Sequence, residues 1–312
     1  ATFVDFRKAF DCVDRNLLQY KLQLNGIDGP MYNAIASLYS NTESCVSLNG
    51  FQTEWFNCTN GVRQGDNLSP TLFSIFIIND LANEIKEANR GIPVNDDNIC
   101  LLLYADDIVL LEENENDMQH VLDILWKWCE KWRINVNISK SNVMHFRRDQ
   151  LPRSTFNFKI GTQPLLIVEQ YRYLGVIFHE KIKFREAAET LSKCVGRALG
   201  AAISKIYSFK EIGFKTFESL FYSCVTPVLD YCSGVWGFDN FSCVDNVQNR
   251  ALRYFLGLHR FTPHLALSGE VGWLPSTERR WLNMFRLWNR LIRMEDSRLT
   301  KKVFYWDYSM QG

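Results

Sequence analysis

The clearest pattern of hydrophobic and polar positions is a pair of apolar runs separated by two aspartates. Residues 99–103 and 108–111 each have the length and composition of a buried strand, and the sequence Tyr-Ala-Asp-Asp at 104–107 joins them. The pattern predicts a β-hairpin that carries Asp106 and Asp107 at its tip. Carboxylates among apolar residues are costly without a cation, so a hard divalent ion such as Mg²⁺ is the expected partner.

A third carboxylate is available near the start of the chain. Thr2–Val4 has the pattern of a strand that ends at Asp5, and a turn into a helix over Asp14–Leu22 follows. Two ions held by Asp5, Asp106 and Asp107 could clamp the attacking and leaving oxygens of a phosphoryl transfer. Asp5 and Asp106 are the principal candidate ligands.

The remaining pattern up to about residue 180 mixes helices and strands. Ser69-Pro70 is a helix start, and the helix should run to about Lys86; a second amphipathic helix follows. The first buries Leu72, Phe73, Phe76, Ile77 and Leu81; the second buries Met118, Val121, Leu122, Leu125, Trp128, Cys129 and Trp132. Further strands are expected over Asn142–Phe146, and over Ser44–Leu48 and Thr53–Asn57 as a hairpin across Asn49-Gly50. Two helices on one face of a small antiparallel sheet predict an α+β domain.

From about Phe184 onward the periodicity is almost wholly helical. The last helix starts at Ser276 and should bury the apolar side chains Trp281, Met284, Phe285, Trp288, Leu291 and Ile292. Arg279, Arg286, Arg290 and Arg293 repeat on the opposite side of this helix. They form either a stripe that tracks phosphates or an ordinary solvated polar face.

Composition narrows the class of protein. The 312 residues are 46% apolar, which is enough for a large core, and no apolar run approaches the length of a membrane span. Nine cysteines without CxxC spacing predict reduced thiols of an intracellular protein; for the parent element of the family resemblance described below, the expected compartments are cytoplasm and nucleus. The net charge is zero, but residues 80–130 hold thirteen acids and three bases, and residues 250–302 hold eleven bases and four acids. This asymmetry suits an enzyme that binds metal at one place and a phosphate backbone at another.

Three ordered motifs carry a family resemblance. They are Phe-Val-Asp-Phe-x-x-Ala-Phe-Asp at 3–11, Gly-Val-Arg-Gln-Gly-Asp-Asn-Leu-Ser-Pro at 61–70, and Tyr-Ala-Asp-Asp at 104–107. The series resembles palm motifs A, B and C of reverse transcriptases, and its details resemble the non-LTR (LINE-type) retrotransposon branch. Tyr-x-Tyr-Leu-Gly at 171–175 is similar to the primer-grip motif of that family, and Val247–Arg253 resembles the helical segment after it.

The resemblance implies a right-hand polymerase palm over 1–180 and an all-helical thumb over 181–312. It implies an RNA-directed DNA polymerase that uses two Mg²⁺ ions, with Mn²⁺ as the alternative metal. Its partners would be an RNA template, a DNA primer and deoxyribonucleoside triphosphates, and no membrane. The fingers and endonuclease segments of the parent polyprotein are expected outside this chain, so a catalytically silent nucleic-acid-binding remnant stays open as an alternative.

The resemblance also assigns roles to individual residues. Phe10 would lie beneath the sugar of the incoming nucleotide and exclude a 2′-hydroxyl, or it is a plain core phenylalanine. Lys140 looks like the lysine of motif D and could protonate the leaving pyrophosphate, or it is a surface lysine. Arg63 could contact phosphate or pair with Asp66. The remaining nucleotide-site residues are Phe6, Ala9, Gln64 and Gly65, and the remaining primer and template contacts are Tyr104, Tyr173, Leu174 and Gly175.

Overall fold

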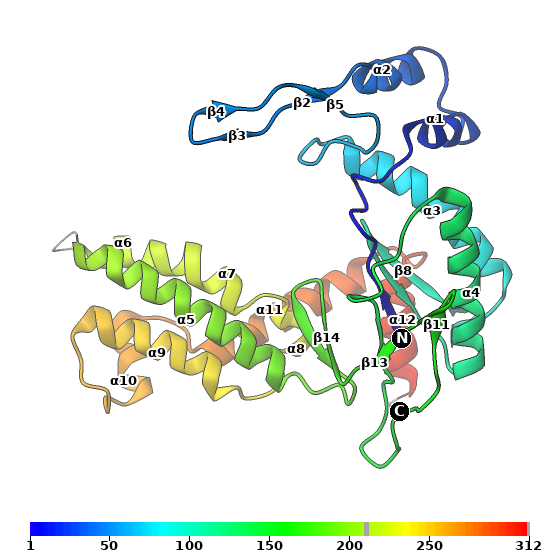
Figure 1. The fold of residues 1–312 in the computed structure, drawn as a ribbon. Coiled ribbons are helices and arrows are strands. Elements are labelled where there is room, and N and C mark those ends of the chain that lie inside the picture. The colour runs from blue at the N-terminus through cyan, green and yellow to red at the C-terminus, as the bar shows by residue number, and fades with distance from the viewer. Residues whose placement is uncertain (209–211, 311–312) are drawn as a thin grey trace. The chain divides into compact units, whose positions relative to one another are not determined.

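The computed structural model describes residues 1–208 and 212–310, with the side chains of 77–79 and 207–208 excepted. The chain divides into two compact units, Ala1–Glu169 and Gln170–Gly312 (Figure 1). The boundary therefore lies before the Tyr-x-Tyr-Leu-Gly segment rather than at 180/181, and that segment belongs to the C-terminal unit. Each unit has its own buried apolar cluster.

The N-terminal unit mixes helices with short strands, as predicted. Its helices are α1 (Arg15–Leu24), α2 (Gly29–Tyr39), α3 (Ser69–Glu87) and α4 (Glu115–Trp132). Its first strands are β1 (Thr2–Val4), β2 (Glu43–Ser44), β3 (Ser47–Leu48), β4 (Phe51–Gln52), β5 (Phe56–Asn57), β6 (Ile92–Val94) and β7 (Asp97–Ile99). The others are β8 (Leu101–Tyr104), β9 (Asp107–Leu110), β10 (Asn142–Val143), β11 (Lys159–Ile160), β12 (Gln163–Pro164) and β13 (Leu166–Ile167).

Five of these strands form the central sheet, in the order β13-β10-β1-β9-β8. β1 pairs antiparallel with both β9 and β10, whereas β10 and β13 are parallel, which corrects the expectation of a wholly antiparallel sheet. The strand predicted over Asn142–Phe146 is only two residues long. The predicted strand that starts at Ile99 is interrupted at Cys100: Ile99 ends β7, which pairs with β6, and β8 pairs with β9.

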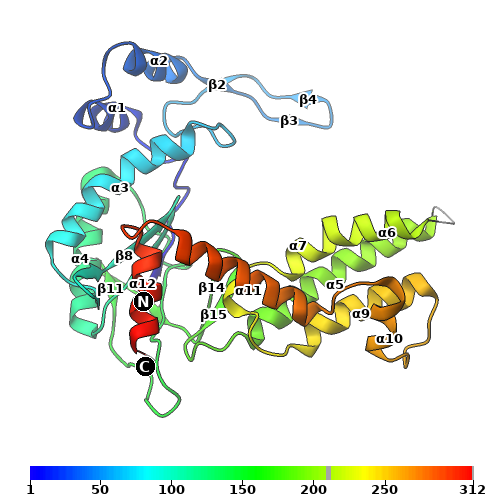
Figure 2. The same cartoon turned by 180° about the vertical axis from the view of Figure 1, so that it is seen from behind.

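α3 and α4 pack side by side against this sheet (Figure 2). The Asn114 side chain accepts a hydrogen bond from the Asp117 amide and so caps the start of α4, and Arg133 in the left-handed conformation ends it. Every residue predicted to be buried on α4 is buried, and the described side chains predicted for α3 are buried too. The side chain of Ile77 lies outside the described residues.

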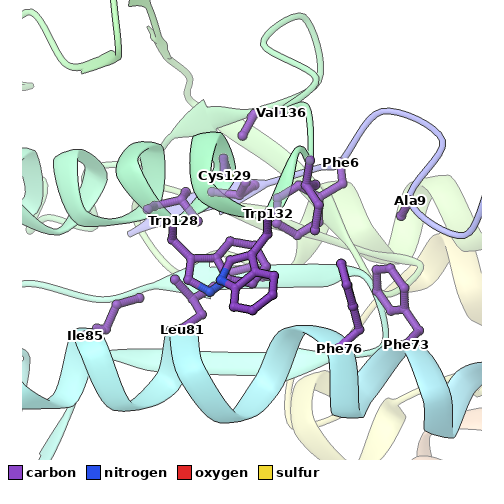
Figure 3. Packing of buried hydrophobic residues seen from close by; sticks show 14 of the residues in the cluster. Phe6, Ala9, Phe73, Phe76, Leu81, Ile85, Trp128, Cys129, Trp132 and Val136 are labelled. Carbon is purple, nitrogen blue, oxygen red and sulfur yellow. The ribbon is translucent and has the colours of Figure 1, made fainter. Parts of the chain in front are cut away.

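The two helices meet through large aromatic rings. Trp128 and Trp132 point from α4 toward α3, where Phe76 meets Trp132 edge to face with ring centroids 5.9 Å apart (Figure 3). Lys21 of α1 is buried at the same place. Burial of such rings contributes on the order of 2–3 kcal/mol each, so this cluster fixes how α3 lies relative to the sheet.

The predicted hairpin across Asn49-Gly50 is present as a ribbon, with β3 paired to β4 and β2 paired to β5. Asn49 (φ +52°) and Gly50 (φ +86°) both have positive φ, as a two-residue hairpin turn requires.

The C-terminal unit begins with a two-stranded hairpin and is otherwise helical. Its elements are β14 (Gln170–Tyr173), β15 (Val176–His179), α5 (Arg185–Ser208), α6 (Phe214–Leu220), the π-helical turn η1 (Phe221–Val225), α7 (Thr226–Leu229), α8 (Ser233–Trp236), α9 (Ser242–Leu256), α10 (His264–Val271), α11 (Ser276–Arg293) and α12 (Leu299–Met310). α5 packs against α9 and against η1 and α7, and α11 packs against α8 (Figure 2). No helix in the described part of the chain is long and apolar enough to cross a membrane.

Candidate active site

The register of the central sheet brings two of the three candidate carboxylates together. Val4, the last residue of β1, lies opposite Ile108 of β9, and continuing this register by one residue sets Asp5 against Asp107, the first residue of β9. Directly opposite residues on antiparallel strands have their Cβ atoms about 4.5–5.5 Å apart and on the same face. Residues 102 positions apart in sequence therefore meet because two buried strands pair.

The third carboxylate lies at the tip of the β8–β9 hairpin. Tyr104 pairs with Asp107, so Ala105 and Asp106 form a two-residue turn. Ala105 has φ +52°, a conformation that costs a residue with a side chain about 1–2 kcal/mol. The predicted hairpin with two aspartates at its tip is present, and the Tyr104 side chain beside it is 64% exposed.

The electrostatics of this corner are unfavourable for a third negative charge. Burial raises the pKa of Asp107, and the neighbouring carboxylates of Asp106 and Asp5 raise it further. The carboxylate of Asp5 accepts a hydrogen bond from the Asn137 side chain (2.9 Å), and the Asp5 amide donates to the Ser141 hydroxyl (3.0 Å). Asn137 and Ser141 were missed from the sequence, although a cluster of Asn and Ser in a turn is typical of such side-chain hydrogen bonds.

The donor set of this corner fits a hard divalent cation. Carboxylate oxygens are the preferred ligands of Mg²⁺, and a cation would offset the mutual repulsion that raises the pKa of Asp107. Within residues 1–208 and 212–310, however, no group of three or more His, Cys, Asp or Glu side chains is gathered closely enough to hold a metal ion. The backbone places the carboxylates, and their side chains are not drawn into a preformed three-ligand cage.

Phe10 is stacked on a second ring. Its centroid lies 4.6 Å from that of Phe73 on α3, with 24° between the ring planes, and Phe10 is half-buried. Ala9 is buried in the core. Phe6, expected at the nucleotide site, is also a core residue: it is 3% exposed and its ring lies 6.5 Å from that of Trp128. The Phe6 side chain therefore packs in the core, and its assignment to the nucleotide site stays a prediction.

The Gly-Val-Arg-Gln-Gly segment at 61–65 is hydrogen-bonded to the segment that follows Asp5. Gln64 donates a hydrogen bond to the Asp11 carboxylate (2.9 Å), and Gly65 has φ +86° just ahead of α3. Arg63 donates to the Leu38 carbonyl (2.9 Å), so it makes a contact that neither sequence alternative anticipated. Arg15 donates to the carbonyls of Gly61, Tyr39 and Cys58 and to the Thr42 hydroxyl, which ties the segment to α1 and α2.

Lys140 lies on the turn that supports Asp5. Its amide donates to the Asn137 carbonyl (3.0 Å), and its side chain is exposed. This placement puts the ammonium close in sequence to Asn137 and Ser141, the two residues that hydrogen bond to Asp5.

The remaining candidates lie in the C-terminal unit. Tyr173, Leu174 and Gly175 form the end of β14 and the turn into β15, with Leu174 (φ +46°) and Gly175 (φ +84°) both in the left-handed region. Arg286, Arg290 and Arg293 are exposed on α11.

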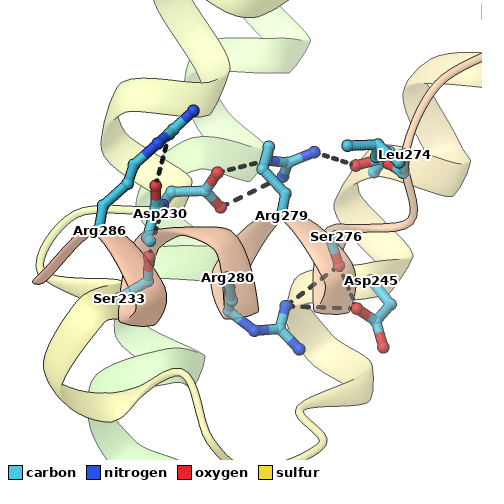
Figure 4. Close-up of polar contacts among 10 residues, drawn as sticks. Asp230, Ser233, Asp245, Leu274, Ser276, Arg279, Arg280 and Arg286 are labelled. Carbon is cyan, nitrogen blue, oxygen red and sulfur yellow. Dashed lines mark hydrogen bonds and ion pairs between the residues drawn. The ribbon is translucent and has the colours of Figure 1, made fainter. Parts of the chain in front are cut away.

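Arg279 does not belong to an exposed stripe, which corrects that part of the prediction. It is 9% exposed, its guanidinium forms a two-point ion pair with the Asp230 carboxylate, and it donates to the Gln248 side chain at 2.6 Å (Figure 4). The neighbouring Arg280 is fully buried and contacts Asp245 and Ser276. The physical reason is that carboxylate and amide acceptors distant in sequence pair with these guanidinium groups.

Comparison with known proteins decides the family. Residues 1–178 match the family described as "Reverse transcriptase (RNA-dependent DNA polymerase)". The chain belongs to the reverse transcriptase family. This match covers all three motifs with their aspartates.

The named relatives of this reverse transcriptase are retrotransposon proteins. The chain is 26% identical over 231 residues to the Pol polyprotein of the type-1 retrotransposable element R2 of Popillia japonica, a match covering 72% of the chain and 38% of the relative. It is 26% identical over 244 residues to the RNA-directed DNA polymerase of the mobile element jockey of Drosophila funebris, covering 75% and 25%. These relatives confirm the non-LTR assignment, and the chain spans well under half of their length.

Among solved structures, this reverse transcriptase is similar to telomerase from Candida albicans in complex with a fragment of telomeric RNA. The TM-score is 0.45 at 13% identity, with 88% of this chain and 51% of the other covered.

Proposed function

We propose that this chain carries the polymerising centre of an RNA-directed DNA polymerase, with the N-terminal unit as its palm and the helices of the C-terminal unit as its thumb. The single observation that carries the proposal is the pairing of β1 with β9, which sets Asp5 opposite Asp107 beside the Asp106 turn. The reaction extends a DNA primer on an RNA template with deoxyribonucleoside triphosphates.

In this proposal the three aspartates would hold two Mg²⁺ ions. Bound there, the ions would supply Lewis-acid chemistry, which would lower the pKa of the primer 3′-hydroxyl and offset the charge of the departing pyrophosphate. Asp5 and Asp106 provide the principal ligand oxygens. Asn137 and Ser141 fix the orientation of Asp5, and Asp107 completes the negative potential that attracts the cations.

The nucleotide would occupy the face next to Phe10. The Phe10 ring, backed by Phe73, excludes a 2′-hydroxyl; the amides of Ala9 and Phe10 meet the triphosphate. Gln64 and Gly65 border the same region ahead of the N-terminus of α3, where the helix dipole favours negative charge. Lys140 donates a proton to the leaving pyrophosphate. Such general-acid help is worth about 10²–10⁴-fold.

Each unit holds proposed primer contacts of its own. Tyr104, exposed beside the aspartate turn, meets the primer terminus. Tyr173, Leu174 and Gly175 act as the primer grip.

Primer extension tests this function. We expect Mg²⁺-dependent synthesis on a primed RNA template from the chain joined to a fingers segment taken from a jockey-type relative. Asp106→Asn should abolish this synthesis, because it removes one ligand charge at the hairpin tip. Asp96→Asn is the matched control, since Asp96 is exposed in the turn between β6 and β7. Full activity in Asp106→Asn, or equal loss in both variants, would refute the proposal.

A second candidate function is nucleic-acid binding without synthesis. The observation that favours it is the exposure of Arg286, Arg290 and Arg293 on α11. It predicts binding that weakens steeply with salt, and a shallower salt dependence when Arg290 and Arg293 are changed to Ala. An unchanged salt slope in that double variant would remove the support for this candidate.

A further inference from the structure

The turn between β14 and β15 holds two successive residues in the left-handed region. Leu174 has φ +46° and Gly175 has φ +84°. The conformation suits glycine, but at Leu174 it costs about 1–2 kcal/mol because the residue has a Cβ. Strained backbone of this kind persists only where the surrounding structure holds it.

Tyr231 provides that support from 57 residues away. Its hydroxyl donates a hydrogen bond to the Leu174 carbonyl oxygen at 2.9 Å. Its ring lies directly over the next residue, because a Cβ built on Gly175 would come 3.2 Å from the Tyr231 Cε1 atom. One side chain therefore fixes the carbonyl of the first turn residue and covers the second.

Tyr231 is in turn held by a buried polar network. The Trp236 indole N–H donates to the Tyr231 carbonyl at 2.8 Å, and Trp236 is fully buried. Asp230, the preceding residue, is clamped by Arg279 of α11, and Asn283 of the same helix donates to the Ser233 hydroxyl at 2.9 Å (Figure 4). The arginine expected to contact phosphate thus anchors the segment that supports the turn.

We propose that Tyr231 is a positioning residue for the primer terminus, acting through the Leu174–Gly175 turn. The inference rests on the proposed function, in which this turn lies against the terminal backbone of the primer. Tyr231 itself touches no substrate. It sets where the turn lies, and a displacement of a reacting group by about 1 Å can reduce a rate by about 10²-fold.

The test removes one hydroxyl and keeps the ring. Tyr231→Phe removes the hydroxyl that donates to the Leu174 carbonyl and keeps the ring, and Tyr254→Phe on α9 of the same unit is the matched control. The first readout is amide hydrogen exchange of peptides covering 170–179 in the 312-residue chain without nucleic acid. The second is the fluorescence of 2-aminopurine at the 3′ end of a DNA primer annealed to an RNA template, which reports how the terminal base is held.

We expect Tyr231→Phe to speed exchange at the turn about fivefold, the equivalent of one hydrogen bond, and to change the terminal fluorescence while the primer affinity stays within about twofold. Tyr254→Phe should change neither readout. If Tyr231→Phe speeds exchange but leaves the terminal fluorescence unchanged, Tyr231 has only a structural role. That result, or no change in either readout, would overturn this inference without affecting the proposed function. Absence of primer binding both by the unaltered chain and by the chain joined to a fingers segment would overturn the proposed function, and the inference with it.

Discussion

α4 and α11 are both 18-residue amphipathic helices, one in each unit, and they bury opposite kinds of side chain. α4 buries its apolar stripe completely. α11 leaves Trp281 50%, Phe285 66% and Trp288 52% exposed, and buries Arg279 and Arg280 instead. The comparison teaches that a strong apolar stripe identifies a helix but does not by itself tell which face meets the rest of the fold.

The partner of each helix explains the difference. α4 lies against α3 and the sheet, whose inward side chains are apolar. α11 lies against α8, where glycines allow close approach: a Cβ on Gly234 would come 3.2 Å from the Asn283 carbonyl oxygen, and one on Gly237 would come 3.0 Å from the Arg280 Cβ. The surface that α11 meets also offers carboxylates, so its polar side is the one that packs.

Exchanging large aromatic residues for alanine should give the largest contrast between the two helices. Trp128→Ala on α4 is expected to destabilise its unit by about 3–5 kcal/mol, because it removes a fully buried ring and leaves a cavity. Trp288→Ala on α11 should change stability by no more than about 0.5 kcal/mol, as at other exposed sites. Urea unfolding, monitored by hydrogen exchange of peptides from α4 and from α11, measures the stability of each unit separately. Equal losses would mean that α11 buries its aromatic face in solution.

The buried arginine offers the reverse contrast within α11. Arg279→Ala should cost about 3 kcal/mol, because it leaves the Asp230 carboxylate, itself only 7% exposed, without its cation. Arg290→Ala, one of the exposed arginines of the same helix, should stay within about 0.5 kcal/mol. The same unfolding measurement applies. A small effect of Arg279→Ala would show that the ion pair does not hold α11 against the rest of its unit.

These contrasts show where sequence reasoning succeeds. The strand at Thr2–Val4 and the hairpin around Asp106 follow from short apolar runs that end in aspartate, and period-two alternation fixes which residues share a face. The family motifs fall on these same elements. The predicted faces of α3 and α4 are right because their partners are apolar as well.

Reasoning from the sequence fails where a contact joins distant positions. The hydrogen bond from Asn137 to Asp5 spans 132 residues, and that from Tyr231 to Leu174 spans 57. No local periodicity marks either pair. The inverted face of α11 has the same origin, since its buried arginines pair with Asp230, Gln248 and Asp245, which lie on segments far from α11 in sequence.

The smallest expected effect concerns Lys21, the buried cation of the N-terminal unit. Its ammonium lies 3.1 Å from the Asp80 carboxylate and 3.7 Å from the centre of the Trp132 ring, and it donates to the Phe76 carbonyl. Unlike Arg279, which has a two-point carboxylate partner and an amide, Lys21 is surrounded mainly by rings. Burial lowers the pKa of Lys21 from its ordinary value of 10.5, and the Asp80 carboxylate only partly opposes this.

The sign of the resulting pH dependence distinguishes this cation from a purely stabilising one. Because the folded protein holds the Lys21 proton less tightly than the unfolded chain, the cost of burying the charge is full at neutral pH. This cost decreases as pH rises from the lowered pKa of folded Lys21 toward 10.5, because the folded protein loses the proton before the unfolded chain does. The free energy of unfolding of Lys21→Met should therefore lie within about 1 kcal/mol of that of the unaltered protein at pH 7. By pH 10 the unaltered protein should become more stable relative to Lys21→Met. Lys127→Met, at an exposed lysine of α4, is the control, and urea unfolding at the two pH values is the measurement. A gap that stays constant between the two pH values would mean that Lys21 keeps its proton throughout, with Asp80 and the rings fully offsetting its burial.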